Sequence, residues 1–566
     1  MSSPQKPSRI VQTNSGPVQG KTYTFVDGRS ASAYLGIPYA EPPVGELRFK
    51  KPLPVKPWKE TRNCCTFGAS SYYKNPTHQI RASEDCLFLN VFTPELSDEQ
   101  KDYPVLFYVH GGGFLLDSST VLGDENICKH LCSRDAVVVT FNYRLGFFGF
   151  LTLETNETPG NYALWDMTMA LQWTHDNIHA FGGNNQRITV FGQSAGCCGC
   201  GLFESFSAFE PSISTRNDYG HEFAIEYAKF LGFADNPEHD EDQRNAALLS
   251  FYKKAKAQSL ALGIMPHPRF RFRSKAMIAL GPVIDGDFFP KPLEELRKEA
   301  PNKPFLNGTT QFEGLLFSVG SLESNHHPIV QSMAAFFMRT LLTPSSFIGR
   351  HLFKKILQKK SRKNNTKPAH ETYKPLVTKL FHQTRPDLSE DKAGEIIDQF
   401  LDPKLPDDEY VKKAIHIISD IMFCHGAYRF SKERTEQGST VYHYSFHYYK
   451  PGSIGLMALL LPFEGPTHCL ELPYLFGKSI LSDFVPDNRD LEMLDKFSTY
   501  LIQFAKTGNP NNDRYPEKWE PFDPNDHDRY FLFDLEEHGM RDGYADKRLP
   551  VWDKIFEDHP RQLDID

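Results

Sequence analysis

A serine with glycines two residues away on either side stands directly after a strand-like run. The segment reads Gly192-Gln193-Ser194-Ala195-Gly196, and the apolar run before it ends at Phe191. On a tight turn from a strand into a helix, the serine hydroxyl is pushed out of the sheet, and the strained turn needs small residues around it. The bare pattern also arises by chance, but here the preceding strand is present. The sequence therefore predicts Ser194 as a nucleophile.

Three consecutive glycines follow another strand-like run, at residues 105–109. They stand in His110-Gly111-Gly112-Gly113-Phe114. Ordering such a run costs backbone entropy, but it lets backbone N–H groups approach a ligand closely. A phosphate cradle is the alternative, but no Lys-Ser/Thr follows and the G-x-G-x-x-G spacing is absent. Together, the two motifs indicate N–H donors that face the oxygen of a tetrahedral intermediate.

A serine hydroxyl is a poor nucleophile at neutral pH, so it needs a base, and the base needs a group that orients it. For a serine on this kind of turn, the expected chain order is serine, acid, histidine. Thirteen of the 21 histidines lie after residue 313. Spacing alone therefore does not choose the base.

The elements that must position these residues are short apolar strands separated by helices. Residues 105–109 are apolar throughout, residues 136–141 and 187–191 are further strand-like runs, and residues 161–181 between the last two carry apolar side chains at helical spacing. Strands of this kind are typical of a parallel sheet covered on both faces. The predicted fold class is α/β.

Composition limits the possible functions. Of the 566 residues, 40% are hydrophobic and 24% are charged, as in a soluble globular protein, and the net charge of −8 argues against nucleic acid as the main partner. The longest apolar stretch, residues 454–463, has ten residues, whereas a membrane-spanning helix needs roughly 20. The first residues, MSSPQKPSRIVQTNSG, contain no apolar run, so we expect no secretory signal and a cytoplasmic protein.

Three other segments carry local signals. Residues 9–25 predict a hairpin that turns at Asn14-Ser15-Gly16, and residues 440–446 alternate like a late strand. A basic run at residues 354–363 favours the solvated face of a helix, with a membrane-surface or partner helix as the alternative. No internal repeat or linker divides the chain, so we expect one domain.

Several longer motifs resemble the type-B carboxylesterase and cholinesterase-like family, and its non-cholinesterase carboxylesterases most closely. The resemblance implies an α/β-hydrolase fold with a large, mostly parallel central sheet, helices on both faces and helical insertions. It implies a single domain at residues 9–555, with short tails at 1–8 and 556–566. The motifs are HGGGF at 110–114, SEDCLFLNVFTP at 83–94, NYRLGFFGF at 142–150, FGGNNQRITVFGQSAG at 181–196 and FAKTGNPN at 504–511.

The same resemblance implies roles for single residues. The acid of the family's triad matches Glu313 in Gly308-Thr-Thr-Gln-Phe-Glu313-Gly314, and the base matches His468 in Gly465-Pro-Thr-His468. His443 and His447, in the expected late strand, are expected to be structural. The oxyanion donors are expected to be Gly112, Gly113 and Ala195. The implied function is a serine carboxylic-ester hydrolase that acts on small-molecule esters without a metal or organic cofactor.

Two departures from the family concern cysteine and tryptophan. Secreted members pair the cysteine equivalent to Cys86 with one that follows an F-G-P-x motif, but here residues 67–71 read FGASS. Cys64 and Cys65 lie nearby, yet free thiols are the simpler expectation without a signal sequence. Cholinesterases carry a choline-binding tryptophan before the E-D-C-L motif, and residues 66–85 contain none. Acetylcholine is therefore not expected as a substrate.

A third departure is the short segment after the nucleophile. Residues 197–203 read CCGCGLF, which leaves five residues between Gly196 and Leu202. A parallel crossover needs at least 10–12 residues. We therefore expect that the usual next strand does not begin at Leu202 or that the sheet lacks it. The alternative function is a catalytically weak or inactive cholinesterase-like interaction protein. The three cysteines lack a second ligand pair at zinc-finger spacing, so no metal site is expected.

Overall fold

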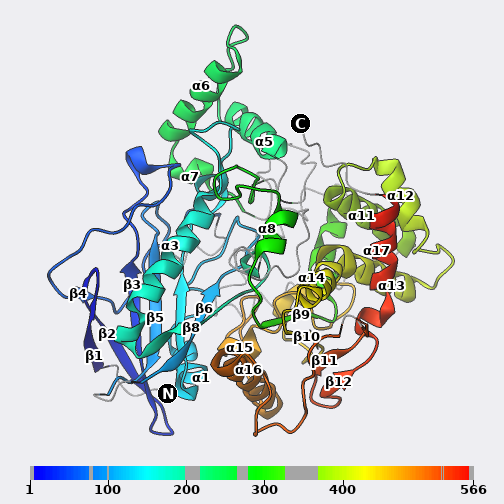
Figure 1. The fold of residues 1–566 in the computed structure, drawn as a ribbon. Helices are drawn as coiled ribbons and strands as arrows, with labels where there is room; N and C mark the ends of the chain where they lie inside the picture. The colour runs from blue at the N-terminus through cyan, green and yellow to red at the C-terminus, as the bar shows by residue number, and fades with distance from the viewer. Residues whose placement is uncertain are drawn as a thin grey trace, which may run out of the picture.

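The computed structural model describes residues 6–74, 81–97, 101–197, 217–263, 270, 278, 280–324, 368–523, 525, 526 and 528–559. Figure 1 shows two sheets surrounded by helices. The first sheet has the strand order β1-β2-β3-β5-β7-β6-β8, with β4 paired to β2. Its strands are β1 (Lys6–Thr13), β2 (Gly16–Thr24), β3 (Ser30–Pro38), β4 (Arg62–Asn63), β5 (Phe88–Pro94), β6 (Tyr103–Val109), β7 (Val137–Phe141) and β8 (Gly183–Gly192).

Antiparallel and parallel pairing divide this sheet. Neighbours from β1 to β7 pair antiparallel, whereas β6 pairs parallel with both β7 and β8. The β1–β2 hairpin turns between Thr13 and Gly16, which confirms the hairpin predicted at residues 9–25. The predicted parallel core is confirmed in β6, β7 and β8. Because β6 and β8 run in the same direction, the glycine run after β6 and the serine turn after β8 both lie at the carboxyl end of the parallel strands.

Alternation along β6 explains why this strand is apolar throughout. Val105, Phe107 and Val109 belong to the core on one face, together with Met167 of α3 (Tyr162–Asn177). Leu106 and Tyr108 belong to the core on the other face, together with residues of α16 (Asn488–Thr507). Successive side chains of a strand point to opposite faces, so a strand with helices on both sides has no polar face. The helix expected at residues 161–181 is confirmed as α3 followed by a 3₁₀ turn at Ile178–Phe181.

A second sheet has the order β12-β11-β10-β9. Its strands are β9 (Phe305–Thr310), β10 (Val441–Phe446), β11 (Tyr530–Phe533) and β12 (Gly539–Arg541), and β10 confirms the predicted late strand. In the described ranges, β8 is an edge of the first sheet and β9 an edge of the second. The short segment after Ser194 lies outside the described residues beyond Cys197, as does the basic run at 354–363.

The remaining helices cover the two sheets. In Figure 1, α11 to α14 and α17 gather beside the second sheet, whereas α1, α15 and α16 lie at the lower end of the molecule. In the part of the chain that the structure describes, no helix combines the length and apolarity needed to cross a membrane. The helices are α1 (Glu125–His130), α2 (Gly146–Phe150), α5 (Asn217–Phe230), α6 (Glu241–Lys254), α7 (Ala257–Leu260), α8 (Leu293–Glu299), α11 (Ala369–Thr384), α12 (Glu390–Asp398), α13 (Asp407–Ser419), α14 (His425–Glu436), α15 (Pro473–Phe476) and α17 (Leu549–Asp558).

Candidate active site

Ser194 lies on a strained turn at the end of β8. Its φ is 58°, in the left-handed region that a residue with a Cβ adopts only at an energetic cost. The turn closes through hydrogen bonds from the Gly196 N–H to the Gln193 carbonyl (2.9 Å) and from the Cys197 N–H to the Ser194 carbonyl (2.9 Å). A Cβ at Gly196 would lie 2.1 Å from the Val109 carbonyl oxygen, so only glycine fits there. The turn that the G-x-S-x-G pattern predicts is confirmed.

The glycine run after β6 packs against this turn. A Cβ at Gly111 would lie 2.7 Å from the Gln193 carbonyl oxygen and 3.1 Å from the Ser194 Cβ. Gly112 and Gly113 have φ values of 98° and 62°, which glycine adopts without strain. No atom of the described residues lies within 4 Å of a Cβ placed on Gly113. Open space therefore borders the glycine run next to the serine turn.

His110 anchors the start of the glycine run. It is buried, its ring stacks on Tyr143 with 4.3 Å between centroids, and the Tyr143 hydroxyl donates to the His110 carbonyl at 2.7 Å. Burial lowers the pKa of the His110 imidazole to about 4, so this ring is neutral at neutral pH.

Glu313 and His468 meet although 155 residues separate them. Glu313 begins the 3₁₀ helix that follows β9, and its Oε1 accepts a hydrogen bond from the Thr310 N–H at 2.7 Å. Its Oε2 lies 2.6 Å from the His468 Nδ1. A carboxylate only accepts hydrogen bonds, so Nδ1 carries the proton. In the neutral ring, the Nε2 atom is then free to accept a proton.

The loop that carries His468 is held by backbone contacts and aromatic rings. The Phe312 N–H donates to the Pro466 carbonyl at 2.9 Å, and the Leu316 N–H donates to the Thr467 hydroxyl at 2.9 Å. The His468 ring packs against the rings of Phe423 and Phe317, with centroids 4.5 and 5.4 Å away. Both His468 and Glu313 are buried, so their hydrogen bond is shielded from water.

The hydrogen bond that the structure gives the His468 Nε2 comes from the Gln193 amide, at 3.0 Å. Gln193 directly precedes Ser194, so this contact holds the histidine against the serine turn. Sequence reasoning missed this contact, although Gln193 stands within the five-residue motif. It also missed the two aromatic rings beside His468: Phe317 stands four residues after Glu313 in the same motif, whereas Phe423 comes from a segment that no local pattern connects to the histidine.

A buried carboxyl, Glu471, lies close to this pair. It stands three residues after His468, and its Oε2 has no hydrogen-bond partner in the described part of the chain. Burial raises the pKa of Glu471 to about 7, with a further contribution from the Glu313 carboxylate. A second buried carboxyl, Asp117, has its pKa raised to about 7 by burial.

The other two histidines considered for the base are placed elsewhere. His443 lies inside β10, where its Nδ1 is 2.9 Å from the Ser431 hydroxyl, and its ring meets Tyr544 edge-on. His447 follows the strand, and its Nε2 lies 3.0 Å from the Ser445 hydroxyl. Burial lowers the pKa of these two rings to about 3 and about 4. No acid orients either ring through a hydrogen bond in the described residues.

Cysteines and metal ligands were the remaining expectations. The described cysteines, at positions 64, 65, 86, 128, 132, 197, 424 and 469, are free thiols. Within the described ranges, no group of three or more His, Cys, Asp or Glu side chains is arranged to hold a metal ion.

Comparison with known proteins gives one consistent family. The model of the carboxylesterase family matches residues 7–552. The chain is 32% identical to esterase cest-33 of Caenorhabditis elegans, over 99% of this chain and 97% of that protein. It is 28% identical to gut esterase 1 of Caenorhabditis briggsae, over 97% of this chain and 93% of that protein. It is 27% identical to the acetylcholinesterase of Bungarus fasciatus, over 89% of this chain and 79% of that protein.

Proposed function

Because the chain belongs to the carboxylesterase family, we propose that it hydrolyses small-molecule carboxylic esters through an acyl-enzyme on Ser194. The observation that carries this mechanism is the buried hydrogen bond between Glu313 and His468, with the Nε2 of His468 against the residue that precedes Ser194. This is the arrangement of an oriented base beside a half-buried serine on a strained turn.

For acylation, the His468 Nε2, which accepts a hydrogen bond from the Gln193 amide, must take the proton of the Ser194 hydroxyl. The serine oxygen then attacks the ester carbonyl while its proton moves to Nε2. The Glu313 carboxylate holds the Nδ1–H and stabilises the imidazolium that forms. Collapse of the tetrahedral intermediate breaks the ester bond, and the leaving alcohol takes the proton from Nε2.

Deacylation repeats the sequence with water as the nucleophile. Water gives a proton to the His468 Nε2 and attacks the acyl carbonyl, and the proton then returns to the Ser194 oxygen as the acid leaves. The proposed oxyanion donors are the backbone N–H groups of Gly112, Gly113 and Ala195. Support comes from the positive φ of both glycines and the open space beside Gly113.

The proposed substrates are neutral esters rather than choline esters. A quaternary ammonium is recognised on an aromatic face, and residues 66–85 lack the tryptophan that the resemblance places there in cholinesterases.

The experiment compares wild type with Ser194→Ala on p-nitrophenyl esters of increasing acyl length, together with labelling by a fluorophosphonate probe. We expect hydrolysis and labelling in wild type and neither in the variant. Labelling of the alanine variant at another serine would show that the nucleophile has been assigned to the wrong residue.

A further inference from the structure

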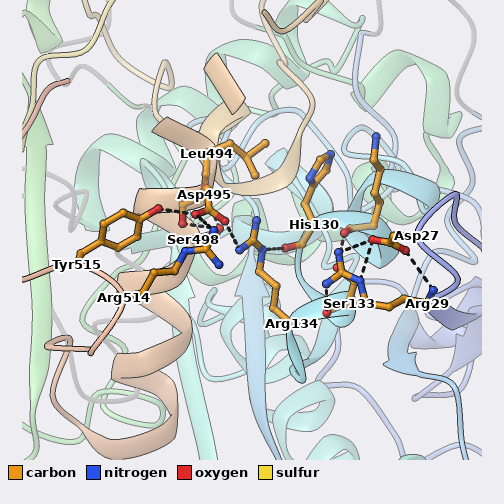
Figure 2. Close-up of polar contacts among 11 residues, drawn as sticks. Asp27, Arg29, His130, Ser133, Arg134, Leu494, Asp495, Ser498, Arg514 and Tyr515 are labelled. Atoms are coloured by element: carbon orange, nitrogen blue, oxygen red, sulfur yellow. Dashed lines mark hydrogen bonds and ion pairs between the residues drawn. The ribbon is translucent and has the colours of Figure 1, made fainter. Parts of the chain in front are cut away.

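A cavity of about 280 Å³ lies between α16, the hairpin loop after β2, and the 3₁₀ turn at Cys132–Arg134. Thr499, Gln503 and Lys506 line it from α16, at positions that share one face of that helix. Segments that are far apart in sequence thus build one concave surface. Figure 2 shows the polar contacts on this side of the molecule.

The cavity is lined by four cations. They are Arg29 from the hairpin loop, Arg134 from the 3₁₀ turn, Lys506 from α16 and Arg514 from the loop that follows α16. Among the described residues, no acidic side chain lines it. His130 lies close by, but burial lowers its pKa to about 4, so it adds no charge at neutral pH.

Two carboxylates partly balance these cations. Asp27 pairs with Arg29 (2.5 Å), and Asp495 pairs with both Arg134 (2.5 Å) and Arg514 (2.5 Å). In Figure 2, Asp495 lies between the two arginines, and Asp27 lies beside Arg29. Four positive and two negative charges leave an excess of two positive charges.

These ion pairs orient the cavity's donors without using all of them. Arg134 gives its Nε to the His130 carbonyl and its Nη1 to Asp495, so its guanidinium is fixed on two sides. The Arg29 Nη1 donates to the Ser133 carbonyl at 2.7 Å. Lys506 forms no ion pair or side-chain hydrogen bond with any described residue. A guanidinium carries five N–H donors and an ammonium three, so donors remain for a ligand.

We propose that this cavity binds a phosphate monoester. Such a group carries a charge of about −1.5 to −2 at pH 7, which matches the excess charge of the site, and its oxygens accept the N–H donors of arginine and lysine. The volume exceeds that of a phosphate group alone, and Thr499, Ile502 and Gln503 also line the cavity. The phosphate is therefore carried by a small polar molecule or by a lipid headgroup.

The cavity is separate from the ester site. Arg134 stands three residues before β7, at the amino end of that strand, whereas Ser194 follows the carboxyl end of β8. Both strands run parallel to β6, so the two sites lie at opposite ends of the parallel strands. The cavity is lined by residues of α16, which lies at the lower end of the molecule in Figure 1 together with α1.

The test is calorimetric titration of the full chain with glucose 6-phosphate, glucose and inorganic phosphate at constant ionic strength. A parallel arm measures sedimentation with phosphatidylcholine vesicles that contain phosphatidylinositol 4-phosphate. The variant is the double substitution Lys506→Gln/Arg514→Gln, which spares the inner Arg134. The matched control is Lys413→Gln on α13, an exposed lysine outside the cavity. Ester hydrolysis by each variant verifies its fold.

We expect glucose 6-phosphate or the vesicles to bind, glucose not to bind, and the double variant to lose at least tenfold in affinity while Lys413→Gln keeps it. Binding of the soluble ester alone assigns a metabolite, and binding of the vesicles alone assigns a headgroup. The proposal is overturned if neither binds, or if the double variant binds as tightly as the control. Arg134→Gln is a second test. If this variant loses affinity for the phosphate ester but keeps ester hydrolysis, the Arg134 guanidinium itself contributes to binding.

Discussion

The two sites at opposite ends of the parallel strands of the first sheet use charge in contrasting ways. At the carboxyl end of the strands, Glu313 and His468 are buried and hydrogen-bonded to each other. At the amino end of the strands, the side chains of Arg29 and Arg514 remain 55% and 62% exposed within their ion pairs. A buried pair has no water to replace its partner, whereas an exposed pair exchanges with solvent at little cost. Burial therefore suits fixed catalytic geometry, and exposure suits reversible binding of an anion.

Removal of the nucleophile is expected to have the largest effect. Ser194→Ala should lower kcat on p-nitrophenyl esters on the order of 10⁴-fold or more, because no acyl-enzyme forms. The apparent Tm should not fall, because the substitution keeps a Cβ and removes only a hydroxyl. Residual turnover within tenfold of wild type would contradict the mechanism.

Removal of the base should come next. His468→Gln should lower kcat by about 10³-fold or more, because an amide does not take the serine proton at neutral pH. His443→Gln is the matched control, since this ring is also buried but has no acid partner among the described residues. It should change kcat by less than about threefold where the variant folds. Equal losses from both substitutions would mean that His468 is not the base.

A smaller effect is expected from the residue that holds the base at rest. Gln193→Met keeps the side-chain length but removes the amide that donates to the His468 Nε2. The His468 Nε2 that accepts this hydrogen bond is the atom that must take the serine proton, and a hydrogen bond contributes about 1 kcal/mol. The rate of fluorophosphonate labelling should therefore rise by up to about fivefold. A tenfold fall would instead make Gln193 a positioning residue for catalysis.

A pH-dependent stability effect should follow from Glu471. Its pKa is about 7 in the folded protein against an ordinary value of 4.5, so the folded state holds a proton that the unfolded chain loses earlier. The resulting stability is fully present below pH 4.5 and is lost as the pH rises to about 7. The apparent Tm of wild type should fall across this window more steeply than that of Glu471→Gln. Glu409→Gln, an exposed control, should keep the wild-type slope, and identical slopes in all three proteins would contradict this reading.

The smallest effect is expected from a substitution at the exposed cationic cavity. Arg514→Gln removes one exposed partner of Asp495, and such a substitution changes stability by less than about 0.5 kcal/mol. The apparent Tm and kcat should both stay within error of wild type. A loss of ester hydrolysis would contradict the separation of the two sites, because it would show that the cavity and the ester site are coupled.

Sequence alone determined the parts of this protein in which chemistry and local pattern coincide. Glycine spacing around Ser194 predicts a strained turn, and the structure has that turn because Gly196 meets the end of β6 without room for a Cβ. The strand-like runs predict the parallel strands β6, β7 and β8. Both faces of β6 and β7 are buried, whereas β8 is half-buried along most of its length. The resemblance to a known family supplied Glu313 and His468, which spacing did not select.

Only the tertiary structure decided which distant groups meet. The hydrogen bond between Glu313 and His468 joins residues 155 positions apart, and Gln193 reaches the same histidine across 275 positions. The cavity at the amino end of the parallel strands takes its four cations from the loop after β2, the 3₁₀ turn before β7, α16 and the loop that follows α16. Such contacts depend on how strands and helices pack, and a local pattern records the periodicity of one element but not its neighbour in space.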